Sequence, residues 1–271
     1  MTDGFPTDTS HFKLIVSDFD GTLAGANHII SSNVKEAIRR WMDSGHFFTI
    51  ASGRQYMMIA EDVKELGLTT PLIVRGGAEI VDFQGKIIFS ESIDRDVIKE
   101  FVEIMVTNDY GVIVEIDDTL YGNFDYGVTE YPHIFEKSLK ELPYTDAPKM
   151  VVRVSAERVE ETENFMNNHV IPKFPTLHLV RSYNVLGMAY DITSLKATKN
   201  LAVLELIRHL GLEREDAVGV GDGYNDFPLL EACGLKVAME NANEDLKKIA
   251  DIIVPSYEQD GVAYLIDKLL K

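Results

Sequence analysis

Short polar strings follow three apolar segments of the sequence. They are Asp18-Phe19-Asp20-Gly21-Thr22, Ser52-Gly53-Arg54 and Gly221-Asp222-Gly223-Tyr224-Asn225-Asp226. If the apolar segments are parallel strands of one sheet, the strings lie at its carboxyl edge, where open α/β sheets bind ligands. The pattern therefore predicts one site that contains several carboxylates, a hydroxyl group and glycine-rich turns.

Asp18 and Asp20 are two residues apart, so their side chains leave a continuing strand on the same side. Gly21 allows the chain to turn sharply just beyond them. With Asp222 opposite, the carboxylates repel one another unless a hard cation neutralises them, and Mg²⁺ prefers such oxygen ligands. Asp20 taken alone could equally cap a turn, whereas the combination of strings favours a magnesium site.

The elements that must position these residues alternate between strand and helix. Residues 13–21, 46–54 and 71–82 have the composition of buried strands, and residues 31–45 and 55–68 have helical patterns. After residue 197 the pattern returns, with a helix over 198–212, strands over 216–223, 235–239 and 250–255, and a final helix over 260–271. This alternation predicts a parallel sheet covered by helices on both faces.

The middle of the chain has a different pattern. After Asp94 the sequence predicts a helix, strands over 110–117 and 119–123, a helix, a strand over 149–155, a helix over 156–169, and strands over 176–182 and 186–193. Paired strands with short turns favour an antiparallel sheet backed by helices. We therefore expect one domain formed by residues 1–83 and 191–271, interrupted by an inserted α+β domain over residues 84–190.

Composition restricts the classes of partner. The 271 residues are 45% hydrophobic and carry a formal net charge of −18, which disfavours nucleic acid and anionic membrane surfaces. A small anionic substrate is still compatible, because a metal ion and one lysine could supply local positive charge. No apolar run has the roughly 18 residues of a membrane span, and the first residues do not resemble a secretory signal. The single cysteine, Cys233, favours a reducing, cytoplasmic location.

Five segments together resemble one protein family. DFDGTL (18–23), TIASGR (49–54), DITSLKATKNLAVL (191–204) and GDGYNDFPLL (221–230) are similar, in order, to the four motifs of the haloacid dehalogenase (HAD) superfamily. The stretch from 237 to 266 resembles the end of the Cof-type, class IIB phosphatases. This resemblance implies a Rossmann-like, HAD-like core with an inserted C2B-type α+β cap. It also implies a magnesium-dependent phosphatase of small phosphorylated metabolites, with sugar phosphates favoured.

The resemblance also implies catalytic roles. Asp18 would attack phosphorus and become an aspartyl phosphate, and Asp20 would act as general acid and then general base. Ser52 and Lys199 would bind the phosphoryl group, as would Asn225. Two alternatives remain open: Ser52 could serve only turn chemistry, and Lys196 lies three residues before Lys199, although the spacing from DIT favours Lys199.

A metal site is implied by the same motifs. Mg²⁺ would be held by Asp18, by Asp222 and by the backbone carbonyl of Asp20. The resemblance also implies that Asp226 and Gly53 support the residues that bind the metal and the phosphate, without binding the metal themselves. Arg54 receives no role, since it could pair with any nearby acid.

Two positions depart from the family pattern. Gly76 stands where Cof-type proteins usually carry asparagine, and Glu240 stands where they usually carry glycine before Asn241. The predicted cap offers candidate specificity residues in its loops: Asp117, Asp118, Asn123, Arg181 and Asn184.

Two other functions compete with the phosphatase, a phosphomutase of the same superfamily and a non-catalytic binding protein. The sequence leaves open whether the chain is a monomer or a homodimer.

Overall fold

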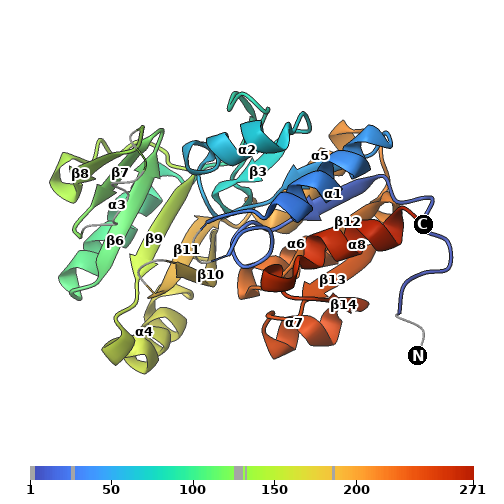
Figure 1. The fold of residues 1–271 in the computed structure, drawn as a ribbon. Helices are drawn as coiled ribbons and strands as arrows, with labels where there is room; N and C mark the ends of the chain where they lie inside the picture. Colours follow the sequence, from blue (N-terminus) through green and yellow to red (C-terminus); the bar gives the residue numbers. More distant parts are fainter. Residues whose placement is uncertain (1–3, 26–27, 125–130, 132, 185–186) are drawn as a thin grey trace. The chain divides into compact units, whose positions relative to one another are not determined.

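The computed structural model describes residues 4–25, 28–124, 131, 133–184 and 187–271 (Figure 1). Its contacts divide the chain into two compact units, one formed by residues 1–88 and 199–271 and the other by residues 89–198. The boundaries predicted from the sequence, 84 and 190, lie several residues earlier.

The first unit contains a five-stranded sheet in which all neighbouring strands are parallel, in the order β14-β13-β12-β1-β2. The strands are β1 (Leu14–Ser17), β2 (Phe47–Ile50), β12 (Ala217–Gly221), β13 (Leu235–Met239) and β14 (Ile252–Val254). β1 lies between β2 and β12. The order places the three segments that precede the polar strings side by side.

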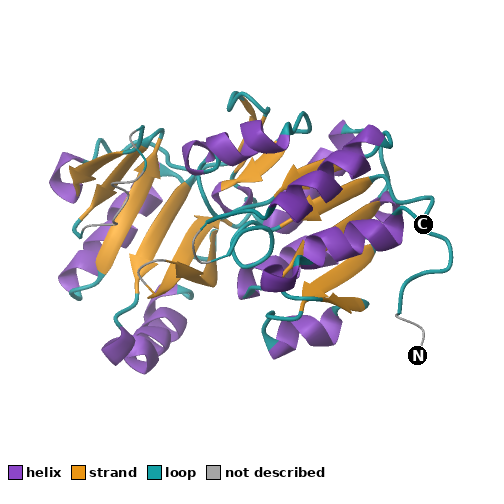
Figure 2. Ribbon diagram, in the orientation of Figure 1, coloured by secondary structure: helices purple, strands orange, loops and turns teal. Residues whose placement is uncertain are grey.

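Helices cover both faces of this sheet. α1 (Ser32–Asp43) and α8 (Gly261–Leu269) supply apolar residues to one core together with alternate strand residues such as Val218 and Val220. Gly219 lies between these two valines. An added Cβ there would meet Cys233 and the carbonyl of Leu229, a residue of α6 (Phe227–Glu231), so α6 packs on the opposite face of the sheet. The predicted parallel sheet with helices on both faces is thus confirmed (Figure 2).

The segment 71–82 is not the single strand that the sequence suggested. It forms β3 (Leu72–Val74) and β4 (Glu79–Val81), which pair antiparallel and continue to β5 (Ile87–Ser90). The prediction was wrong because Arg75, Gly76 and Gly77 turn the chain with φ values of 53°, 71° and 104°. The predicted helix over 55–68 is likewise divided, into a short 3₁₀ turn (Tyr56–Met58) and α2 (Ala60–Leu66).

The second unit is built on a six-stranded sheet in the order β10-β11-β9-β6-β7-β8. Its pairs are antiparallel except for β7 with β8. The strands are β6 (Gly111–Ile116), β7 (Thr119–Gly122), β8 (Phe135–Ser138), β9 (Lys149–Arg153), β10 (Leu177–Asn184) and β11 (Gly187–Ser194). α3 (Arg95–Thr107) contributes Ile98 and Phe101 to the core of this unit, and α4 (Val159–Phe165) packs against it.

One predicted helix of this unit is wrong. Between β7 and β9 the described residues form β8 and a 3₁₀ turn, Leu139–Glu141, which Ser138 caps. Pro143 and Pro148 restrict the backbone after the turn and oppose a longer helix.

In the part of the chain that the structure describes, no helix combines the length and the apolar character that a membrane crossing requires.

Candidate active site

The carboxyl ends of β1, β2 and β12 meet at one edge of the parallel sheet. The Asp18 N–H donates to the Val220 carbonyl at 2.9 Å, and the Ala51 N–H donates to the Ser17 carbonyl at 2.8 Å. The three polar strings therefore begin side by side, as the pattern of strands predicted. Asp18 and Ser52 are both buried at this edge, with 4% and 1% of their surface exposed.

A buried lysine joins two aspartates there. Lys199, the first residue of α5 (Lys199–His209), donates from Nζ to Asp18 Oδ1 at 2.6 Å and to Asp226 Oδ1 at 2.7 Å. Lys196 is exposed. Burial alone would lower the pKa of Lys199, but the charges and hydrogen bonds of the two aspartates raise that pKa above its usual range. The ammonium is therefore charged at all ordinary pH values.

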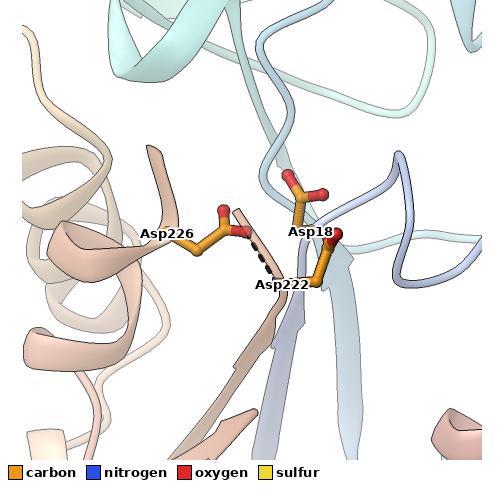
Figure 3. A group of neighbouring side chains, drawn as sticks. All are labelled: Asp18, Asp222 and Asp226. Atoms are coloured by element: carbon orange, nitrogen blue, oxygen red, sulfur yellow. Dashed lines mark hydrogen bonds between the residues drawn. The ribbon is translucent and has the colours of Figure 1, made fainter. Parts of the chain in front are cut away.

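Three carboxylates gather around this lysine. Each of Asp18, Asp222 and Asp226 offers an oxygen that lies within 4.8 Å of the others (Figure 3). Asp226 Oδ2 accepts hydrogen bonds from the backbone N–H groups of Asp222 and Gly223, at 2.9 and 2.8 Å. Asp222 Oδ1 accepts from the Thr22 hydroxyl at 2.9 Å. The motifs imply only a supporting role for Asp226, yet its carboxylate is part of the acidic group.

Protonation equilibria reflect this crowding of negative charge. Burial, and next the charge of Asp226, raises the pKa of Asp18 well above its ordinary value, against the opposing effect of Lys199. The same two causes raise the pKa of Asp222 to about 7. A divalent cation would relieve this repulsion, and carboxylate oxygens are ligands that Mg²⁺ prefers. The residues therefore fit a magnesium site.

Two glycines allow the carboxylates to approach the backbone so closely. Gly21 has a φ of +81°, and an added Cβ would lie 2.4 Å from Asp222 Oδ2. An added Cβ at Gly221 would lie 2.6 Å from the Asp226 side chain. Asn241 fixes the first turn, because its Nδ2 donates to the Gly21 carbonyl at 2.8 Å. The motifs predict no role for Asn241, although it stands in the C-terminal stretch that resembles the Cof-type phosphatases.

Asp20 lies in more exposed surroundings than Asp18. Its side chain is 43% exposed and receives two hydrogen bonds from Arg54, Nε to Oδ2 at 2.8 Å and Nη2 to Oδ1 at 2.7 Å. Ser52 Oγ accepts from the Arg54 N–H at 3.1 Å, so its own hydroxyl hydrogen can still be donated to another acceptor. Sequence reasoning could not choose Arg54's partner, because its long side chain can reach several acids.

The other site residues lie in the adjoining turns. Gly53 follows Ser52 and is half-buried, and Asn225 is half-buried in the 3₁₀ turn Tyr224–Asp226.

The two residues that depart from the family pattern, Gly76 and Glu240, differ in backbone conformation. Gly76 has a left-handed φ, a conformation that asparagine also tolerates. Glu240 is not among the described residues with a positive φ, so its backbone does not require glycine.

The five candidate specificity residues belong to the second unit. Asp117, with a φ of 48°, and Asp118 form the turn between β6 and β7. Asn123 bridges backbone groups, accepting from the Val112 N–H at 2.8 Å and donating to the Tyr110 carbonyl at 3.0 Å. The remaining two lie on β10: Arg181 pairs with Glu163, and the side chain of Asn184 lies outside the described residues.

Comparisons with known proteins agree with this arrangement. The profile of the haloacid dehalogenase-like hydrolases matches residues 15–266. The Bacillus subtilis phosphatase YwpJ is 26% identical over 284 residues, spanning 95% of this chain and 100% of that protein. A Methanopyrus kandleri phosphoglycolate phosphatase is 27% identical over 260 residues, or 96% and 97% of the two chains. A solved HAD subclass IIB sugar phosphatase superposes with a TM-score of 0.81 at 25% identity, covering 94% and 98%.

Proposed function

Because the chain belongs to the haloacid dehalogenase-like hydrolases and is a phosphatase of that family, we propose that it hydrolyses small phosphorylated metabolites with Mg²⁺ and a covalent intermediate on Asp18. The observation that carries this proposal is the buried contact of Lys199 with Asp18 and Asp226, beside Asp222. Phosphate release across a panel of phosphate esters, with and without a chelator, tests it. Activity that persists at the full rate after chelation would contradict the metal requirement.

The reaction divides into two steps. In the first, an Asp18 oxygen attacks phosphorus, the bond to the leaving oxygen breaks, and protonated Asp20 transfers its proton to that oxygen. In the second, Asp20 removes a proton from a water molecule that attacks phosphorus, and the bond to Asp18 breaks. Inorganic phosphate leaves, and both aspartates return to their starting states.

The surrounding residues support these steps. Lys199 offsets the charge of Asp18 and of the incoming phosphoryl group, while the Ser52 hydroxyl and the Asn225 amide donate to phosphoryl oxygens. Asp18 and Asp222, with the Asp20 carbonyl, would hold Mg²⁺, which supplies electrostatic stabilisation of the transferring phosphoryl group. Gly53 gives the phosphate access to the backbone, and Asp226 holds Lys199 in place.

Magnesium binding should weaken as the pH falls below about 7. The pKa of Asp222 is raised to about 7, so below that pH the metal-free carboxyl holds a proton that Mg²⁺ must displace. We expect the dissociation constant to rise by about tenfold or more per pH unit below 7, because the pKa of Asp18, the other carboxylate that would hold the metal, is raised as well. Calorimetric Mg²⁺ titrations between pH 6 and 8.5, in buffers of different ionisation enthalpy, measure this dependence. A pH-independent affinity without proton release would contradict it.

For the substrate, we propose a class of phosphate esters. The relatives' names include a phosphoglycolate phosphatase and a sugar phosphatase, so the family alone does not select one ester. We favour sugar phosphates and propose that the second unit is a cap that selects the leaving group. A location in the cytoplasm is part of the same proposal.

Asp118→Ala tests the division of work between the units. The change should shift the ratios of kcat/KM among natural phosphate esters. Hydrolysis of a small aryl phosphate should stay within about tenfold of the wild-type rate, because a mutation that alters only substrate binding does not alter the chemistry of the transition state. Asn123→Ala is a poor choice because it removes two hydrogen bonds inside the unit. Loss of aryl phosphate hydrolysis in folded Asp118→Ala protein would show that the second unit supplies a catalytic group.

A further inference from the structure

We propose that Arg54 is a positioning residue for Asp20, which it holds in the orientation needed for proton transfer to the leaving group. The inference rests on the proposed function, in which Asp20 is the general acid and base. Neither the sequence motifs nor the comparisons give Arg54 this role.

Asp20 needs an external support. It follows the end of β1 just before the left-handed turn at Gly21, and 43% of its side chain is exposed. Asp18, two residues earlier, is buried and is held by Lys199. An exposed aspartate samples several rotamers, and only some of them can reach a leaving oxygen.

Arg54 provides that support through two parallel hydrogen bonds. Its Nε and Nη2 donate to the two Asp20 oxygens at 2.8 and 2.7 Å, a paired geometry that fixes the plane of the carboxylate as well as its distance. Lysine could not reproduce this arrangement, because an ammonium group acts as a point charge. When one Asp20 oxygen carries the transferable proton, the other still accepts from Arg54.

Arg54 is itself held from several sides. Its N–H donates to Ser52 Oγ at 3.1 Å, and its carbonyl accepts from the Arg75 N–H at 2.8 Å. The guanidinium lies over the ring of the fully buried Phe19, with 5.4 Å from Cζ to the ring centroid. A nitrogen of His28 lies 2.7 Å from Nη2. These contacts tie the position of the general acid to the loop that carries Ser52.

The proposal predicts a loss that depends on the leaving group. A poor leaving group such as phenolate needs a proton as the bond to phosphorus breaks, whereas dinitrophenolate departs without one. The ratio kcat/KM reports the chemistry up to departure of the leaving group. We expect Arg54→Ala to lower kcat/KM for phenyl phosphate about a hundredfold and for dinitrophenyl phosphate less than about fivefold.

The same variant should slow the second step with every substrate. Asp20 activates the water that attacks the aspartyl phosphate, so dinitrophenyl phosphate should give a burst of about one dinitrophenolate per active site. Arg54→Lys should recover only part of the loss on phenyl phosphate. Arg40→Ala is the matched control, because it removes an Arg–Asp pair, Arg40 with Asp267 at 2.8 Å, between α1 and α8. It should leave both rates unchanged.

A double-mutant cycle separates positioning from direct contact with the substrate. If Arg54 acts through Asp20, adding Arg54→Ala to Asp20→Asn should cost less than about threefold on phenyl phosphate. Equal losses on both esters, or a full additional loss in the Asp20→Asn background, would overturn the proposal, as would wild-type rates in Arg54→Ala. Wild-type protein without magnesium-dependent hydrolysis of either ester would instead contradict the proposed function.

Discussion

Asp18→Asn should lower phosphate release by about four orders of magnitude or more, as the loss of other catalytic nucleophiles does. The amide that replaces the carboxylate cannot form the aspartyl phosphate. The protein should still fold, because Lys199 keeps its contact with Asp226 at 2.7 Å and asparagine matches aspartate in size. Initial rates with a saturating phosphate ester, together with circular dichroism of the variant, measure both expectations.

Asp20→Asn is the comparison for this variant. It removes acid–base catalysis but keeps the nucleophile, so the loss should be about a hundred- to ten-thousandfold. The loss should be larger for esters with poor leaving groups. If Asp18→Asn kept more than about a tenth of the wild-type rate, the covalent scheme would be wrong.

Lys199→Ala should abolish nearly all turnover and also destabilise the fold. Its side chain is 2% exposed and its ammonium group contacts both Asp18 and Asp226, so its removal leaves two buried carboxylates without their counter-charge. Breaking a buried ion pair in this way costs about 3–5 kcal/mol of unfolding free energy. Hydrolysis of sugar and aryl esters should fall together, since both reactions pass through the same phosphoryl group. Urea unfolding and paired rate measurements test the two effects.

Lys196→Ala is the matched control, because this lysine lies three residues earlier and is exposed. Its removal should change stability by less than about 0.5 kcal/mol and leave both rates near the wild-type values. If Lys196→Ala instead gave the larger loss of turnover, the assignment of the phosphate-binding lysine to Lys199 would be incorrect.

Much of the catalytic unit could be predicted from local sequence. The buried strands before Asp18, Ser52 and Asp222 are short apolar runs with polar ends, and each run forms a strand of the parallel sheet. The helix that begins at Lys199 lies within the helix predicted over residues 198–212. Backbone pairing then brings the strand ends together, because parallel neighbours end at the same edge.

Features that depend on tertiary contacts could not be predicted in this way. The Arg54–Asp20 pair joins loops 34 residues apart through a side chain that could have reached other acids. The strand expected over 71–82 turns back at Arg75, whose left-handed φ is unusual for a residue with a side chain. β8 forms where a helix was expected, because pairing with β7 outweighs the local helical preference.

Trapping the phosphorylated enzyme would show whether Asp18 is the nucleophile. Protein mixed with Mg²⁺ and a ³²P-labelled ester is quenched in acid within the first turnover, digested, and the labelled peptide is identified by mass spectrometry. We expect an acid-stable, base-labile phosphate on Asp18 that forms and decays as fast as turnover requires, and none in Asp18→Asn. Steady phosphate release with no label on Asp18, or with label on a different residue, would contradict it.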